Sequence, residues 1–180
     1  DWSGSTIGTV PIGQGIAVTP LQMIGAYAAI GNGGVMPAPH VIEKIGGKRV
    51  SHGGARRIVS RHTADRMIAM FRDVVLEGTG TEAAIPGYTV AGKTGTANKA
   101  ENGHYVSKYV ASFVGLVPAR KPRLAILVMI DEPHGQIYGG VVAAPVFRDI
   151  ARFALQYLEV PPDAPETKRS SSLLASFTTP

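Results

Sequence analysis

The stretch Gly87–Thr96, GYTVAGKTGT, is compatible with two structures that exclude one another. Gly87, Gly92, Lys93 and Thr94 satisfy the pattern G-x-x-x-x-G-K-[ST], which is typical of a phosphate-binding loop. The same letters can instead form an extended strand, because Tyr88, Thr89 and Val90 are good strand formers. Whether this stretch is a loop or a strand decides which chemistry the protein performs.

The neighbouring sequence favours the strand. A phosphate-binding loop follows a strand and opens directly into a helix, whose N-terminal N–H groups face the anion. Upstream, however, the pattern predicts a helix and a Gly/Thr-rich loop, and downstream GTANKAENG (95–103) has the composition of a turn. One feature supports a P-loop nucleotidase, namely AILVMIDE (125–132), which imitates an apolar strand ending in a magnesium-binding acid. The nucleotidase is therefore kept as an alternative.

If the stretch is an edge strand over 88–97, its side chains alternate between two faces. Lys93 and Gly95 then share one face, and Thr94 and Thr96 share the other, unless twist or a bulge relaxes this division. Gly95 leaves room for another molecule to approach the backbone. An open edge can also accept an extended peptide as an added strand.

Hydrophobic periodicity predicts the remaining elements. Thr19 and Pro20 indicate a helix start, and a Gly-rich stretch at 31–34 indicates its end. Further helices are expected at 61–77 and 143–158, the latter with an apolar stripe. Strands are expected at 108–117 and 123–131, and short connections predict antiparallel neighbours. The uninterrupted apolar run in the last strand predicts a central strand that is covered on both faces. The expected stripe consists of Phe147, Ile150, Ala154 and Leu158, widened by Phe153 and Tyr157.

Composition excludes several classes of protein. The chain has 180 residues, no cysteine and a formal net charge of +5. Its length suits one domain, and it contains no apolar run long enough to span a membrane. The five histidines lack the close spacing of metal ligands, so neither a metal nor a cofactor is expected. Basic residues gather loosely at 44–49, 56–66 and 120–123 without interleaved aromatic residues, which argues against nucleic-acid binding. They are expected to form solvated surface or to attract an anionic surface or polymer.

Four stretches in a fixed order carry a resemblance to a known family. They are TIGTVPIGQGIAVTPLQMIGAYAAIGNGGVMPAPHVI (6–42), IPGYTVAGKTGTANK (85–99), YVASFVGLVPARKPRLAILVMIDEP (109–133) and YGGVVAAPVFRDIARFALQYL (138–158). Together they resemble the C-terminal part of the transpeptidase domain of class B penicillin-binding proteins, and the division-specific type is the most similar. Lys-Thr-Gly alone is a weak signal, but its position within this ordered set makes the match specific.

The resemblance implies an α/β fold of the α+β type, like that of β-lactamases and transpeptidases, in which helices flank an antiparallel sheet. Residues 1–160 would form the C-terminal portion of this domain, and residues 161–180 a tail rich in Pro, Ser and Thr. The domain would be incomplete, because two strands of the sheet lie in the upstream half.

The resemblance also implies site residues. Lys93 would place positive charge beside the nucleophilic serine. Thr94 and Thr96 would donate hydrogen bonds to the carboxylate of the substrate or of a penicillin, and the backbone N–H of Thr96 would form half of the oxyanion hole. Gly95 would let the substrate lie against the strand. Tyr138, in GQIYGG, would line the cleft or pack locally.

The implied activity is acyl transfer between peptidoglycan stem peptides, with β-lactams acylating the same serine. The nucleophile is not in this sequence, since no serine is followed three positions later by lysine and none lies two before asparagine. We therefore expect an upstream half that carries S-x-x-K and S-x-N, and a chain that is inactive alone. The resemblance further implies division-complex partners and a location at the extracytoplasmic face of the membrane, anchored by a segment outside this chain. A non-catalytic sensor or scaffold, a carboxypeptidase and a β-lactamase stay open as alternatives.

Overall fold

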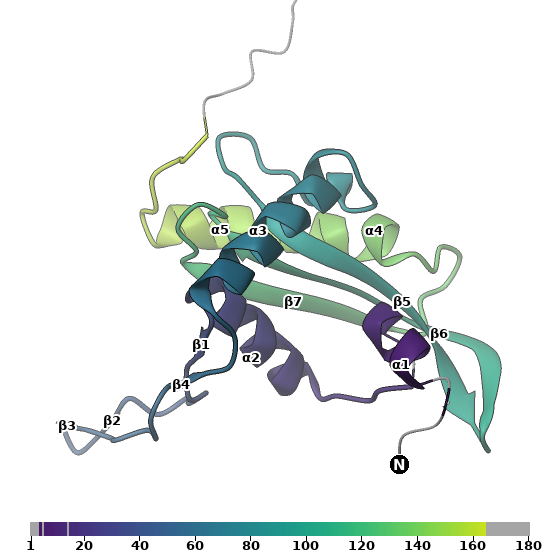
Figure 1. Ribbon diagram of the computed structural model, residues 1–180. Coiled ribbons are helices and arrows are strands. Elements are labelled where there is room, and N and C mark those ends of the chain that lie inside the picture. Colours follow the sequence, from purple (N-terminus) through teal and green to yellow (C-terminus); the bar gives the residue numbers. More distant parts are fainter. Residues whose placement is uncertain (1–3, 5, 14, 165–180) are drawn as a thin grey trace, which may run out of the picture.

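A three-stranded antiparallel sheet with helices on both faces forms the body of the computed structural model (Figure 1), which describes residues 4, 6–13 and 15–164. The strands are β5 (Ala91–Glu101), β6 (His104–Val117) and β7 (Leu124–Asp131), in the order β5-β6-β7. The antiparallel arrangement and the flanking helices agree with the α+β fold expected from the sequence.

The motif-bearing stretch is extended. Gly92–Asn98 lie within β5, where Lys93 is paired with Val114 and Thr96 with Ala111 of β6. A phosphate-binding loop needs this segment to open into a helix, so the P-loop alternative is wrong. The strand begins at Ala91 rather than at Tyr88, because Tyr88 instead forms an isolated bridge with Ile85.

Helix α2 (Pro20–Gly31) covers one face of the sheet, after the short helices α1 (Thr6–Thr9) and η1 (Val10–Ile12). It starts as the sequence predicted. The Thr19 hydroxyl accepts a hydrogen bond from the Gln22 N–H at 3.2 Å, and Gln22 Oε1 accepts one from the Thr19 N–H at 2.8 Å. This reciprocal capping box satisfies two N–H groups that the helix itself leaves unpaired. At the other end, a Cβ on Gly31 would lie 3.1 Å from Leu116 Cδ2, so the helix lies close against β6.

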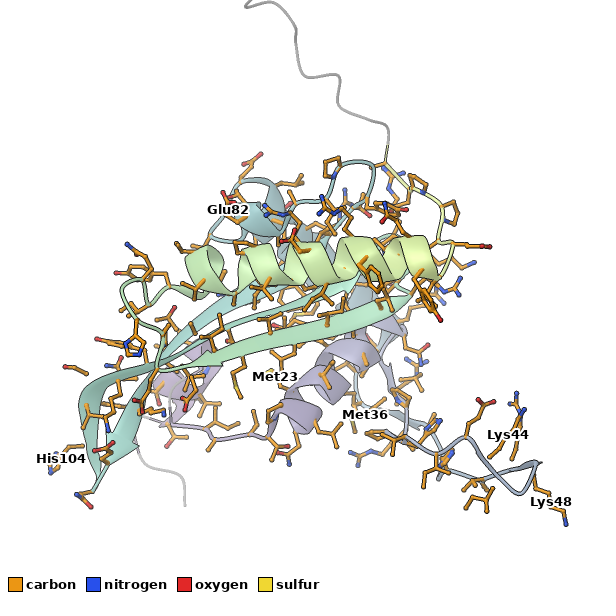
Figure 2. The ribbon with its side chains drawn as sticks, turned by 180° about the vertical axis from the view of Figure 1, so that it is seen from behind. Met23, Met36, Lys44, Lys48, Glu82 and His104 are labelled. Carbon is orange, nitrogen blue, oxygen red and sulfur yellow. The ribbon has the colours of Figure 1, made fainter. Side chains whose placement is uncertain are left out.

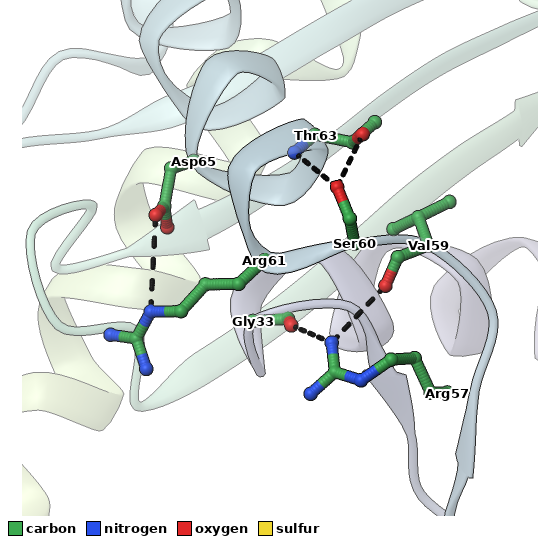
Figure 3. Close-up of polar contacts among 7 residues, drawn as sticks. All are labelled: Gly33, Arg57, Val59, Ser60, Arg61, Thr63 and Asp65. Atoms are coloured by element: carbon green, nitrogen blue, oxygen red, sulfur yellow. Dashed lines mark hydrogen bonds and ion pairs between the residues drawn. The ribbon is translucent and has the colours of Figure 1, made fainter.

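Helix α3 (Arg61–Leu76) packs against both α2 and β5. Its N-cap is Ser60, whose hydroxyl accepts a hydrogen bond from the Thr63 N–H at 3.0 Å (Figure 3). Tyr27 of α2 stacks on Phe71 of α3 with ring centroids 5.1 Å apart, and burial raises the pKa of Tyr27 to about 12. The short helix η2 (Thr81–Ala83) follows α3 and leads toward β5.

The opposite face of the sheet is covered by α4 (Gly139–Val142) and α5 (Ala144–Tyr157). Phe147 of α5 meets Phe113 of β6 with ring centroids 4.8 Å apart, at the centre of the core. The stripe expected on α5 is partly wrong. Phe147 is buried as predicted, and the other buried residues of the helix are Ala144, Ala151 and Leu155. The predicted residues that are instead exposed are Ile150, Phe153, Tyr157 and Leu158.

β7 lies at the edge of the sheet in the described part of the chain, although its apolar sequence predicted a central strand. Only Val128 is buried, and Met129 is 51% exposed. A run such as LAILVMI is typical of a strand that is covered on both faces and paired on both edges. The arrangement is the one expected if further strands complete the sheet.

Residues 35–57 extend away from the body as two antiparallel segments joined by a turn (Figure 2). The base of this extension is the pair of strands β1 (Val35–Met36) and β4 (Arg56–Arg57), and its tip is the pair β2 (Lys44–Ile45) and β3 (Lys48–Arg49).

Most of the expected tail, 161–180, lies outside the described residues, which end at Ala164. The part that is described contacts the body, because the N–H groups of Asp163 and Ala164 both donate to the Gly87 carbonyl at 3.1 Å. In the parts of the chain that the structure describes, no helix has the length and apolar character needed to cross a membrane.

Candidate active site

β5 presents Lys93, Thr94, Gly95 and Thr96 on an edge strand of the sheet. The register with β6 is continuous from Ala91 to Asn98, and the single irregularity lies beyond the motif, between Asn98 and Ala100. The side chains therefore alternate strictly. Thr94 and Thr96 share the face of Phe113 and α5, and Lys93 and Gly95 share the face that α2 covers elsewhere.

Lys93 is exposed, and its ammonium group donates a hydrogen bond to the Thr94 carbonyl at 2.8 Å. Within the described residues it forms no ion pair with a carboxylate. Its charge is therefore available to a negatively charged group that approaches this strand.

The Thr94 hydroxyl is held by a residue that sequence reasoning missed. Thr79, in the loop between α3 and η2, has its hydroxyl oxygen 2.7 Å from that of Thr94. Either oxygen can be the donor, so one of the two hydroxyls keeps a proton to donate to a further acceptor. The only sequence signal was the Gly/Thr-rich composition of EGTGT (77–81), which does not single out Thr79.

The Thr96 hydroxyl is contacted by the segment that follows β7. It accepts a hydrogen bond from the Gly139 N–H at 3.2 Å. Gly139 has no room for a side chain, since a Cβ there would overlap the carbonyl oxygens of Gly95 and Ser112. Gly95 is less confined, because a Cβ on it would overlap only Ser112 Oγ, a side-chain atom that can rotate away.

Tyr138 directly precedes this contact, so the structure brings it beside the strand. Its side chain is 61% exposed, and its carbonyl accepts a hydrogen bond from the Val141 N–H at 2.8 Å at the start of α4. The next glycine, Gly140, lies against the Thr79 carbonyl, with Thr94 Cγ2 3.4 Å from where its Cβ would be. Both the Thr79 loop and the Tyr138–Gly140 segment thus converge on the two threonines of β5.

The entry to β5 is fixed by the end of the described chain. The Asp163 carboxylate accepts hydrogen bonds from the Thr89 backbone N–H, at 2.6 Å, and from the Thr89 hydroxyl. The Thr89 carbonyl in turn accepts a hydrogen bond from the Ala119 N–H at 2.8 Å. Lys93 lies four residues beyond this junction, so Asp163 orients the strand without reaching the motif itself.

The far end of β5 is fixed by an ion-pair cluster. The Lys99 ammonium lies 2.7 Å from an Asp131 carboxylate oxygen and 2.8 Å from one of Glu132. Hydrogen bonds to Asp131 and Glu132 raise the pKa of Lys99, and the bond from Lys99 lowers the pKa of Glu132. Glu132 has a φ of 48°, as is typical of a residue in a turn.

Among the described residues no group of three or more His, Asp or Glu side chains could hold a metal ion. What the strand offers is one cation, two hydroxyls on the opposite face, and a peptide backbone at a sheet edge. These are the groups that bind a carboxylate-bearing peptide in an extended conformation.

Comparison with known proteins shows to which family the chain belongs. The family described as the penicillin-binding protein transpeptidase domain matches residues 1–152. The chain is 39% identical over 169 residues to the peptidoglycan D,D-transpeptidase FtsI of Escherichia coli, and 38% identical over 163 residues to the stage V sporulation protein D of Bacillus subtilis. These alignments include 91% and 86% of this chain, respectively.

Solved structures give the same result. The crystal structure of penicillin-binding protein 3 from Mycobacterium tuberculosis, complexed with ampicillin, superimposes with a TM-score of 0.82 and 38% identity, over 91% of this chain and 40% of that one. The chain spans about a quarter of the relatives' length, 27% of the Escherichia coli protein and 25% of the Bacillus subtilis protein.

Proposed function

The chain belongs to the penicillin-binding protein transpeptidase family, and from that premise we propose that it forms part of a serine D,D-transpeptidase that cross-links peptidoglycan stem peptides. The observation that carries the proposal is the extended Lys-Thr-Gly segment at the edge of the sheet, with the hydroxyls of Thr94 and Thr96 each fixed by a second segment. A preorganised set of donors is what acyl transfer needs, because it stabilises charge without reorganising during the reaction.

The residues of β5 have distinct roles in this proposal. Lys93 lowers the energy of the ionised serine and of the proton network around it. Thr94 and Thr96 donate to the terminal carboxylate of the stem peptide, and Gly95 allows the peptide backbone to approach the strand. The Thr96 N–H donates to the developing oxyanion, a contact of a kind that is worth about 2.7–4 kcal/mol of transition-state stabilisation. Tyr138 lines the cleft next to the Gly139–Thr96 contact.

The reaction is a two-step acyl transfer. The serine oxygen attacks the carbonyl carbon of the penultimate D-alanine and loses its proton to a base. The peptide C–N bond breaks, and the departing D-alanine takes up a proton. An amine of a neighbouring stem peptide then attacks the acyl ester, forms the cross-link and returns the proton to the serine. A β-lactam would acylate the same serine through opening of its ring.

The nucleophilic serine is supplied by an upstream half of the domain, carrying S-x-x-K and S-x-N. Two features of this chain support that proposal. The outer edge of β7 is unpaired in the described residues, although its sequence suits a central strand. Apolar side chains on α5 are also left uncovered, with Phe153 70% exposed and Tyr157 77% exposed. Added strands and a helix would cover both.

The biological setting is part of the same proposal. FtsI is named as a peptidoglycan D,D-transpeptidase, which supports a role in peptidoglycan cross-linking. The resemblance to the division-specific type is the ground on which septal synthesis with division-complex partners is proposed. The catalytic part would then work at the extracytoplasmic face of the cell membrane, anchored by a segment outside this chain.

Labelling with a fluorescent penicillin tests the proposal on the polypeptide that includes the upstream half. The unsubstituted polypeptide should be labelled covalently. Lys93→Ala should slow acylation by about 10²-fold or more, because a charge that stabilises the transition state is lost. The matched control is Lys121→Ala, an exposed lysine away from the motif. Unchanged acylation in Lys93→Ala would remove Lys93 from the mechanism. Labelling without turnover of a stem pentapeptide would favour the sensor or scaffold.

A further inference from the structure

Residues 35–57, hereafter the basic arm, extend away from the body of the protein, as both views show (Figure 1, Figure 2). Lys44 and Lys48 lie at its far end, well away from the sheet and from the Lys-Thr-Gly strand (Figure 2). The proposed acyl transfer uses no residue of this arm.

The base of the arm is fixed to the body by strand pairing and hydrogen bonds, so the arm leaves the body in a defined direction. β1 pairs with β4, and the N–H of Ile58 donates to the Gly34 carbonyl at 2.9 Å. Arg57 adds a side-chain clamp, since its Nη1 donates to the Gly33 carbonyl at 2.8 Å and to the Val59 carbonyl at 3.2 Å (Figure 3). Gly34 has a φ of +89°, and a Cβ on it would overlap the Val59 carbonyl oxygen.

The tip of the arm is a regular hairpin. Lys44 pairs with Arg49 and Ile45 with Lys48, and the two connecting residues, Gly46 and Gly47, have φ angles of 54° and 78°. Two consecutive positive φ angles are typical of a type I′ turn, whose twist matches that of the strands. In the described residues neither strand of this hairpin pairs with a third one. Its backbone can therefore pair with an extended peptide.

The arm carries most of the excess charge of the protein. It has one carboxylate, that of Glu43, against five cations: Lys44, Lys48, Arg49, Arg56 and Arg57. The net charge of the whole chain is +5. Arg49 pairs with Glu43 at 3.3 Å and Arg57 is used at the base, but the other three cations form no ion pair within the described part of the chain. The arm is thus poised to attract an acidic group.

Exposed aliphatic side chains lie between these cations. Val41 is 99% exposed, Ile45 66% and Ile42 50%. A polyanion such as a phosphate polymer offers nothing to these side chains. A lipid surface is also a poor match, because residues 35–57 contain no Trp, Tyr or Phe, and the outermost residues of the turn are glycines. The combination fits a peptide that has both acidic and aliphatic residues.

A cavity of about 300 Å³ lies between the hairpin and the base of the arm. His40, Glu43, Arg49 and His52 are among the residues that line it. The two imidazoles are stacked, with ring centroids 3.7 Å apart, and the buried Nε2 of His52 has no hydrogen-bond partner in the described residues. A cavity of this size with an unused polar atom can take up a single carboxylate side chain.

We propose that the basic arm binds an acidic, partly aliphatic segment of a partner protein, which pairs in extended form with the β2–β3 hairpin and places one carboxylate in the cavity beside His52. Long-range attraction by Lys44, Lys48 and Arg56 guides the segment to the arm. The aliphatic residues of the segment pack on Val41 and Ile45, and the His52 Nε2–H donates to the inserted carboxylate. This surface is separate from the proposed active site and does not depend on its activity.

The probe is a fluorescent peptide of alternating Glu and Val, and its affinity for the full-length polypeptide is measured by fluorescence anisotropy. Lys44→Glu/Lys48→Glu should weaken binding about tenfold or more, because two attractive charges become repulsive. Ile45→Ser should weaken it several-fold through loss of apolar contact. The matched control is Arg120→Glu/Lys121→Glu, which changes the net charge equally on another part of the surface.

Two further probes, phosphatidylglycerol vesicles and polyphosphate, decide the class of partner. Tighter binding of either probe than of the peptide would overturn the proposal, as would equal peptide affinities of the arm variant and the control. No effect of Ile45→Ser would also overturn it, since a purely electrostatic partner would then suffice. Far-UV circular dichroism and the unfolding midpoint show that each variant is folded. If the upstream half covers the arm, the arm substitutions leave peptide binding unchanged, and the proposal fails.

Discussion

Gly139 donates its backbone N–H to the hydroxyl of Thr96 at 3.2 Å, which joins the segment after β7 to the Lys-Thr-Gly strand. A Cβ on Gly139 would overlap the carbonyl oxygens of Gly95 and Ser112. The contact therefore exists only because residue 139 is glycine, and it determines where the Thr96 hydroxyl and Tyr138 lie.

Gly139→Ala should push this segment away from β5. We expect acylation of the polypeptide with its upstream half by fluorescent penicillin to slow by about 10- to 100-fold, since small displacements of positioning groups have effects of this size. The control is Gly54→Ala, where a Cβ would meet nothing within 4 Å. Equal acylation rates for the two variants would mean that the Gly139–Thr96 contact does not position the site.

Thr79→Val should release the Thr94 hydroxyl, which lies 2.7 Å from that of Thr79. The size of the side chain is kept and one hydrogen bond is lost, so acylation should slow by about 2- to 10-fold. Thr81→Val, at an exposed position in η2, is the control and should have no effect. A double-mutant cycle with Thr94→Val measures the coupling, and additive effects of the two substitutions would show that the hydroxyl pair is unimportant.

Asp163→Ala should loosen the entry to β5, because the Thr89 N–H and hydroxyl both lose their acceptor. Loss of a charged acceptor at a partly buried site should lower the free energy of unfolding by about 1–3 kcal/mol. Asp65→Ala is the control, since its ion pair with Arg61 is long, at 3.9 Å, and exposed. Chemical denaturation of the full-length protein measures both, and equal effects would contradict the role given to Asp163.

Lys99→Met should destabilise the protein in a pH-dependent way. The pKa of Glu132 is lowered by Lys99, so this part of the stabilisation is present above the pKa of Glu in the unfolded chain and is lost as the pH falls through the lower folded value. The pKa of Lys99 is raised above 10.5, so its part is present below 10.5 and is lost as the pH rises through the folded value.

The measurement for Lys99→Met is the difference in denaturation midpoint between parent and variant as a function of pH. The difference should be largest between these two limits and should shrink toward acid and toward strong alkali. Arg61→Met, which removes an exposed i,i+4 pair, should give a small difference throughout. A difference for Lys99→Met that does not change with pH would point to lost packing instead of lost ion pairs.

The isolated chain of 180 residues should fold weakly or aggregate. The unpaired edge of β7 and the exposed aromatic residues of α5 leave apolar surface and backbone groups that invite association. Size-exclusion chromatography and thermal unfolding test this, with the polypeptide that includes the upstream half as the control. A monomer with a single cooperative unfolding transition would be evidence against the need for an upstream half.

Local sequence was sufficient for several elements because their causes lie within a few residues. The capping box of Thr19 and Gln22 starts α2. The turn composition after the motif argued against a loop that opens into a helix, although the β-prone residues 88–90 lie just before β5. The alternation that separates Lys93 from Thr94 follows from the two-residue period of a strand. Local sequence thus favoured a strand over a phosphate-binding loop, and the pairing of β5 with β6 decided between them.

Contacts between distant segments decided the rest. The packing of α5 on β6 determined which face of the helix is buried, namely the face of Phe147 and Leu155. The sequence could not show this, because apolar residues occur on both the buried and the exposed faces of α5. Thr79 lies 15 residues before its partner Thr94, and Asp163 lies 74 residues after Thr89. Sequence determined which segments extend and which coil, since those preferences are local. Tertiary structure determined which hydroxyl meets which donor, because such a pairing exists only after the whole chain has packed.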